Sequence, residues 1–172
     1  MRVESLDRPV TSARLMRVAR RLLDAARLCA IATKDRGDAY VNTAYFAWTA
    51  RLEIVWISSE EARHSRNLRA DPTCAIAVFD THQTWGGNDR GIQLFGRARL
   101  ARGRARTNAK RAYGKRFRAY DPKENAGLPP YVFTPTLVKL FHEGEFGGAT
   151  WVVARVRSGR LVWQRTERYD AG

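Results

Sequence analysis

The part of the chain that most constrains the fold is residues 52–80, where two short apolar runs flank a helical segment. Residues 52–57 are rich in Ile, Val and Trp, and residues 73–79 form a second run of strand composition. Ser59 is placed to cap a helix of about three turns between them. The Asp71-Pro72 pair ends that helix, because a residue before proline is disfavoured in helical geometry. The stretch therefore predicts a strand, a helix and a second strand.

The chemistry of this unit lies in the first turn of the predicted helix. Glu60, Glu61 and Ala62 open it, and acidic side chains suit the positive end of the helix dipole. Arg63 and His64 follow beside the free backbone N–H groups of the helix start, which favour anions. A planar arginine at that place suits a phosphate. The alternative interpretation is a solvated helix end with ordinary basic surface residues.

Length and composition favour one soluble globular domain over residues 1–172. The sequence is 44% hydrophobic and lacks the run of about 18 apolar residues that a membrane span needs. The N-terminus has no apolar core followed by a small-residue cleavage site, so we expect a cytoplasmic protein and no secretory signal. Cys29 and Cys74 fall in apolar strands without metal-ligand spacing, which predicts buried, reduced thiols.

The formal charge of +14 raises the question of nucleic-acid binding. The arginines are spread over the whole chain, and no recognition helix, zinc finger or aromatic RNA-binding motif is present. The arginine excess could equally reflect genomic base composition. We therefore expect no specific nucleic-acid partner, and we favour small anions or phosphates as ligands.

The remaining chain adds short strands and few helices. Apolar residues at helical spacing predict an N-terminal helix over residues 12–26, and the Asp35–Asp38 turn predicts a hairpin of residues 28–33 and 39–48. Further strands are predicted at residues 91–102, 131–142, 150–156 and 161–163, a helix at 104–117, and loops at 80–90 and 143–148. Seven or eight short antiparallel strands favour a mostly β fold, a small barrel with attached helices.

Standard catalytic and metal-binding motifs are absent from the sequence. There is no GxGxxG, P-loop, GxSxG or HExxH pattern, and no glycosidase-type carboxylate pair can be singled out. His64, His82 and His142 lie far apart without metal-ligand spacing, so we expect no metal site. If the protein is an enzyme, a bound cofactor should supply the difficult chemistry.

The central unit resembles a known family. The succession LCAIATKDRGDAYVNTAYFAW, IVWISS, EEARHSRNLRADP, TCAIAVFD and GIQLFGRARL is similar to the pyridoxamine 5'-phosphate oxidase-like family of FMN-binding split β-barrels, over roughly residues 13–103. A Ser-Arg-Lys run that holds the FMN phosphate in the family matches Ala62, Arg63 and His64, so the lysine is replaced. The family's phosphate-binding arginine on the second strand falls on Asn42. A family glutamine falls near Gly91, with Gln93 on the same face.

The resemblance implies a flavin site and a dimer. The backbone that faces the flavin ring falls on Thr43, Ala44 and Tyr45, and the pair that ends the preceding strand falls on Ile57 and Ser58. The residues expected to bind the cofactor are Arg63, His64, Ser58, Ser59, Asn42, Thr43, Ala44, Tyr45 and Gln93. The substrate-binding lysine of the vitamin oxidase would lie at Ala47, and the family's RLHDR motif is missing, which disfavours that reaction.

We therefore expect an FMN-dependent oxidoreductase that acts on a small organic molecule, with the site completed by the partner subunit of a homodimer. The catalytic residues and the substrate are not indicated. Three alternatives stay open: a non-catalytic flavin-binding or regulatory module, a deazaflavin- or haem-dependent protein of the same fold, and a nucleic-acid binder that exploits the charge.

Overall fold

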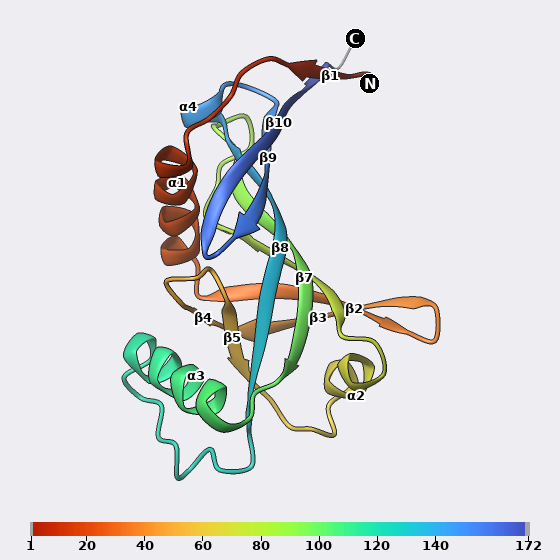
Figure 1. Cartoon of the computed structure of the whole chain (residues 1–172), viewed down its shortest axis with the longest axis vertical. Coiled ribbons are helices and arrows are strands. Elements are labelled where there is room, and N and C mark those ends of the chain that lie inside the picture. Colours follow the sequence, from red (N-terminus) through yellow and green to blue (C-terminus); the bar gives the residue numbers. More distant parts are fainter. Residues whose placement is uncertain (1, 171–172) are drawn as a thin grey trace. The chain divides into compact units, whose positions relative to one another are not determined.

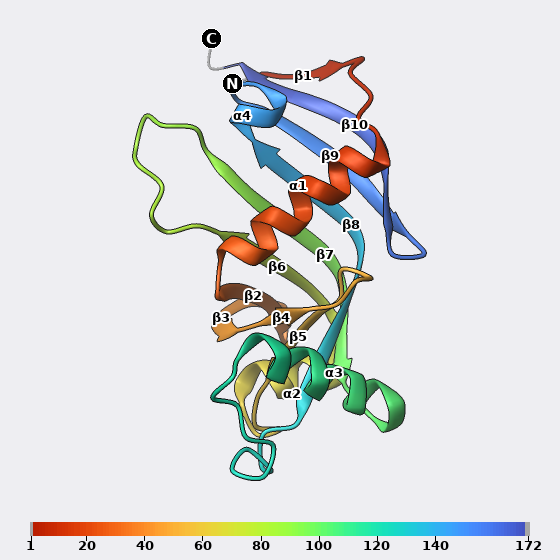
Figure 2. The ribbon, with the colours of Figure 1, turned by 90° about the vertical axis from the view of Figure 1, so that its left-hand side faces the viewer.

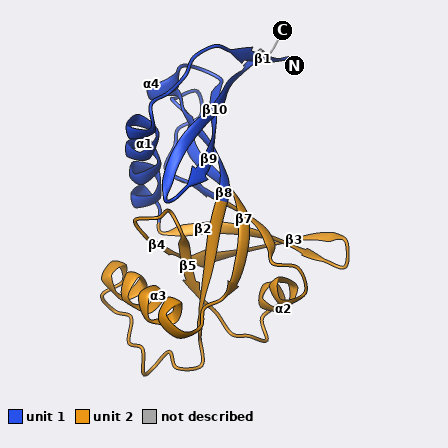
Figure 3. Cartoon of the chain, in the orientation of Figure 1, with its two compact units in different colours: residues 1–26, 77–94, 136–172 blue, residues 27–76, 95–135 orange. Residues whose placement is uncertain are grey.

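The computed structural model describes residues 2–170 as a mostly antiparallel β structure with four helices (Figure 1). The chain divides into two compact units, which are coloured separately in Figure 3. Unit 1 comprises residues 1–26, 77–94 and 136–172, and unit 2 comprises residues 27–76 and 95–135. Three strands contribute to both units: β6 (Thr73–Phe79), β7 (Arg90–Leu100) and β8 (Pro130–His142).

Unit 1 is built on antiparallel strands. β10 (Arg160–Asp170) pairs with β1 (Arg2–Leu6) and with β9 (Thr150–Arg157), and β9 pairs with the second half of β8. Helix α1 (Ser12–Ala25) packs against β10 and runs along the sheet of unit 1 in Figure 2, and the short helix α4 (Glu143–Phe146) follows β8. Thr11 caps α1 through its hydroxyl, which accepts a hydrogen bond from the Arg14 N–H.

The apolar face predicted for the N-terminal helix is buried in α1. The residues of this face that are 0–9% exposed are Leu15, Val18, Ala19, Leu22, Leu23 and Ala26. Their spacing places them on one side of a 3.6-residue helix, so that burial drives the helix onto the sheet. The expected position of this helix, residues 12–26, is therefore confirmed to within one residue.

Unit 2 begins with the hairpin of β2 (Leu28–Asp35) and β3 (Asp38–Tyr45), in the register that places Ile31 opposite Asn42. Arg36 and Gly37 join the strands with φ values of 51° and 102°. Two positive φ values match the right-handed twist of a two-residue hairpin, as the sequence predicted. The strand predicted over residues 39–48 is interrupted at Phe46, because β4 (Ala47–Trp48) turns away to pair with β5 (Ile54–Ile57).

The core of unit 2 is apolar and contains a rigid aromatic pair. β5 also pairs with the first half of β8, which brings Trp56 beside Tyr131. Their rings stack with centroids 5.6 Å apart and planes at 12°, and both side chains are buried. Helix α3 (Gly103–Arg116) packs on β4 and β5 through Ala109 and Tyr113.

Several boundaries differ from the sequence prediction. Strand β1 was not predicted, α4 occupies a segment expected to be a loop, and β10 extends well beyond the expected residues 161–163. β1 is exposed along most of its length and joins the sheet by pairing with β10. Because neither side of this strand is buried, its sequence shows no alternation of apolar and polar residues from which a strand could be predicted. Within the described residues, no helix is long and apolar enough to cross a membrane.

Candidate functional site

The candidate site is organised around helix α2 (Arg63–Ala70), which starts later than the sequence predicted. The N-cap residue is Ala62 rather than Ser59, and the helix has eight residues, about two turns. Ser59 instead accepts a hydrogen bond from the Glu61 N–H through its hydroxyl, which closes a local turn. Because the Ser59 hydroxyl forms this turn, it does not cap the helix as predicted. Glu60 and Glu61 therefore lie before the helix and not in its first turn.

This later start places Arg63 and His64 at the first two helical positions. Ala62 has no polar side chain that could cap the helix, and no side-chain cap hydrogen bond is present at this N-cap among the described residues. Uncapped N–H groups at a helix start favour an anion both through hydrogen bonding and through the dipole. The predicted Asp71 and Pro72 end is confirmed, since Asp71 is the C-cap residue.

Arg63 is oriented by the β2–β3 hairpin. Its guanidinium is 2.6 Å from the Asp35 carboxylate and stands over the Tyr40 ring, 4.6 Å from the ring centroid. The Arg63 side chain is 51% exposed, so this ion pair is partly solvated. Arg63 is thus held in place beside the helix start, and Asp35 competes with any incoming anion.

His64 is buried rather than exposed. Only 8% of the residue is accessible, and its ring meets the Tyr131 ring edge to face at 6.5 Å. The Nε2 atom is buried and has no hydrogen-bond partner among the described residues. Desolvation lowers the pKa of His64 from its usual value of 6.5, which favours the neutral imidazole at physiological pH.

Four residues of the predicted site lie on strand β3, where successive side chains point to opposite faces of the hairpin. Asn42 and Ala44 are half-buried on the inner face, whereas Thr43 and Tyr45 are exposed on the outer face. The Asn42 Oδ1 atom is buried without a hydrogen-bond partner among the described residues, although its Nδ2 donates weakly to the Thr43 carbonyl at 3.5 Å. An unsatisfied buried amide is costly, and a polar ligand could satisfy it.

The other predicted residues lie in two different units. Ser58 follows β5, and its backbone N–H donates to the Pro129 carbonyl at 3.2 Å, while Ser59 stands in the turn before α2. These two residues belong to unit 2, together with Arg63, His64 and the hairpin residues. Gln93, half-buried in β7, belongs to unit 1. The structure therefore brings eight of the nine residues into one compact unit.

Sequence reasoning missed the residues that fix α2 against the hairpin. The Asn67 side chain is buried and donates to the Thr33 hydroxyl at 3.0 Å. Asn67 is four residues after Arg63, so both side chains point from the same side of the helix toward β2 and β3. That spacing was visible in the sequence, whereas the roles of Asp35 and Tyr40 depend on how the hairpin lies against α2.

Other reactive groups do not add to the site. Cys29 and Cys74 are buried free thiols, as predicted, and burial raises the pKa of each to about 12. No group of three or more His, Cys, Asp or Glu residues that could hold a metal occurs within residues 2–170.

A known protein family matches most of this chain. The sequence profile described as pyridoxamine 5'-phosphate oxidase matches residues 15–139. No curated protein matches the chain significantly.

Solved structures share the fold at low sequence identity. A haem binding protein from Mycobacterium smegmatis is 19% identical with a TM-score of 0.65, and the match covers 90% of this chain and 61% of that chain. A FAD-binding protein from Mesorhizobium loti is 16% identical with a TM-score of 0.55, covering 80% and 96% of the two chains. A protein described as F420 reductase is 20% identical with a TM-score of 0.53, covering 69% and 93%. The predicted fold class, a mostly antiparallel split barrel with attached helices, is confirmed, although the sheet is not closed.

Proposed function

The chain belongs to the pyridoxamine 5'-phosphate oxidase family, and from this premise we propose that it binds FMN and performs a flavin-dependent redox reaction on a small organic molecule. Related structures are described as binding FAD or haem, or as F420 reductase, so a flavin-type or haem cofactor fits the fold. We choose a flavin that bears a phosphate because the start of α2 is uncapped and Arg63 is its first residue.

The side chains of unit 2 fit such a cofactor. Arg63 would hold the phosphate together with the N–H groups of α2, with Ser58 and Ser59 beside it. Two buried polar atoms that lack partners among the described residues, Asn42 Oδ1 and His64 Nε2, would gain hydrogen bonds from a ligand. The ring would lie along the backbone of residues 43–45.

A bound flavin would supply the redox chemistry, by accepting and returning electrons. The protein would bind the cofactor, orient it and limit its exposure to water. The substrate lysine of the vitamin oxidase is replaced by Ala47, which is buried. We therefore propose a substrate other than pyridoxamine 5'-phosphate.

A homodimer would complete the site. The outer face of the β2–β3 hairpin exposes Leu28, Val41 and Tyr45 at 49%, 63% and 57% of their surfaces. Leu28 and Tyr45 stand directly opposite each other in the strand register, so these apolar side chains share one face. Burying them against a second copy would remove apolar surface from water.

Light scattering tests the dimer directly. We expect twice the mass of the chain with cofactor bound, and we expect Val41→Asp to weaken association. Val162→Asp is the matched control, because Val162 is also exposed, at 40%, but lies on β10 of unit 1. A monomer that binds the cofactor fully would overturn the dimer proposal.

The visible spectrum of the purified protein tests the cofactor. We expect flavin absorption bands that remain with the protein through gel filtration. A Soret band would instead favour haem, for which the buried and unpartnered His64 Nε2 offers a ligand atom. A protein that carries a flavin but shows no turnover with any reductant would indicate a binding or regulatory module.

A further inference from the structure

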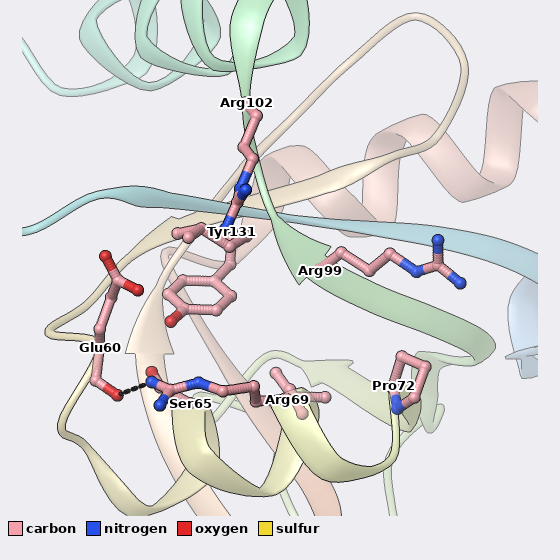
Figure 4. Close-up of a pocket in the computed structure, with 9 residues that line it drawn as sticks. Glu60, Ser65, Arg69, Pro72, Arg99, Arg102 and Tyr131 are labelled. Carbon is pink, nitrogen blue, oxygen red and sulfur yellow. Dashed lines mark hydrogen bonds between the residues drawn. The ribbon is translucent and has the colours of Figure 1, made fainter.

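Unit 2 contains a pocket on the other side of α2 from Arg63. It has a volume of about 360 Å³ and is formed by α2, the segment that precedes it, the end of β7 and the start of β8. Its polar lining comprises Glu60, Ser65, Arg69, Arg99, Arg102 and Tyr131 (Figure 4). Leu68, Pro72 and Leu100 supply apolar walls. Such a combination of a small apolar space and a few polar groups is typical of a ligand site.

The two faces of α2 separate this pocket from the proposed flavin site. With about 100° between successive residues, Arg63 and Asn67 point to one side of the helix, toward Asp35 and Thr33. Ser65 and Arg69 are rotated by roughly half a turn from that direction and line the pocket. A ligand in this pocket would therefore not occupy the phosphate position beside Arg63.

The pocket is positively charged. Three arginines stand against one carboxylate, Glu60, which leaves a formal surplus of two positive charges. Arg69 is fixed by donating to the Glu60 carbonyl at 2.9 Å. Neither Arg99 nor Arg102 forms an ion pair with any residue in the described part of the chain. In Figure 4, Arg102 extends toward Tyr131, whereas the Arg99 guanidinium points away from it.

Two buried side chains complete the pocket. Ser65 is 1% exposed, and its hydroxyl has no hydrogen-bond partner among the described residues, although burial of an unpaired hydroxyl is unfavourable. Tyr131 is 3% exposed and stacks on Trp56, so its ring is a rigid wall. A ligand oxygen at this position would accept a hydrogen bond from the Ser65 hydroxyl and would be attracted by the positive charges of the arginines.

We propose that this pocket binds a small phosphomonoester with an apolar body, as a second ligand in addition to the flavin. A phosphomonoester carries nearly two negative charges at neutral pH, and the arginines of the lining outnumber its single carboxylate. Arg102 and Arg69 would hold the phosphate, Ser65 would donate to it, and Tyr131 with the apolar residues would contact the body of the ligand. Glu60 would accept a hydrogen bond from a ligand hydroxyl or amine.

Isothermal titration calorimetry with phenyl phosphate tests this site. The wild-type protein should bind phenyl phosphate, and phenol, which lacks the phosphate, should bind far more weakly. Arg102→Gln should weaken phenyl phosphate about 10- to 100-fold, the range expected for a lost charge-assisted contact. Arg102 makes no capping hydrogen bond in α3, so the substitution should leave the fold intact. Arg97→Gln, two positions before Arg99 on β7 and outside the pocket, should leave binding unchanged.

A third variant separates this pocket from the flavin site. Arg63→Gln should keep the phenyl phosphate affinity of the wild type, whether or not the protein binds FMN. Binding that is lost in Arg63→Gln and kept in Arg102→Gln would place the anion at the start of α2 and overturn the proposal. Equal affinities for phenyl phosphate and phenol, or no binding of phenyl phosphate at millimolar concentration, would overturn it as well.

Discussion

The ion pair between Arg63 and Asp35 gives a specific prediction about cofactor affinity. If the FMN phosphate binds Arg63, it must compete with the Asp35 carboxylate, which lies 2.6 Å from the guanidinium. Asp35→Asn removes the competing charge and should therefore strengthen FMN binding. Both partners are partly exposed, at 51% and 24%, so the pair contributes no more than about 0.2–1 kcal/mol. Removing it should lower the Kd for FMN by up to about fivefold.

A double-mutant cycle measured by quenching of FMN fluorescence tests this reasoning. Arg63→Ala alone should raise the Kd by about 30- to 150-fold, which corresponds to roughly 2–3 kcal/mol for a bidentate charged contact. In the Arg63→Ala background, Asp35→Asn should have little further effect, because the carboxylate then has no guanidinium to hold. If Asp35→Asn changed the Kd by the same factor in both backgrounds, the Asp35 carboxylate would not compete with the phosphate for Arg63. Its negative charge would then repel the phosphate directly.

Three further predictions concern other parts of the chain. A Cβ atom on Gly96 would lie 2.2 Å from the Thr134 carbonyl oxygen, so Gly96→Ala should cost at least about 1–3 kcal/mol in the free energy of unfolding by urea; an unchanged midpoint would contradict this close packing. Burial keeps the pKa of free His64 below its usual value, and a bound phosphate dianion would raise the pKa in the complex. FMN affinity should then be highest at pH values below the pKa of the free protein and should fall as pH rises through the pKa of the complex, whereas His64→Gln should remove that dependence; identical pH profiles would mean that His64 does not sense the phosphate. Any DNA binding by this protein of charge +14 should be indifferent to sequence and should weaken steeply with added salt, and a preferred DNA site that survives physiological salt would contradict this.

Periodicity and turn chemistry in the sequence predicted much of the fold. The buried stripe of α1, the two-residue turn at Arg36 and Gly37, and the helix end at Asp71 all follow from local rules that act within a few residues. β1 escaped prediction because its stability depends on pairing with β10, more than 150 residues away in sequence. Contacts of that kind leave no periodic pattern in the strand itself.

The sequence predicted that Arg63 and His64 lie near the start of a helix, but not the contacts that these residues make. The start of a helix after a buried strand pointed to Arg63 and His64, and the structure places both in the first turn of α2. The sequence could not show that Asp35 pairs with Arg63, because that contact joins residues 28 positions apart. Nor could it show that His64 is buried, since the face of α2 that contacts the core depends on where the helix begins.

The affinities of FMN and riboflavin, compared on the wild-type protein, test the central claim most directly. The two molecules share the ring and the ribityl chain and differ in the phosphate, which the proposed site holds through Arg63 and the N–H groups of α2. We expect FMN to bind about 30- to 150-fold more tightly than riboflavin, the same range as for the loss of Arg63. Equal affinities, or binding of neither molecule, would contradict the proposal that this protein binds FMN through its phosphate.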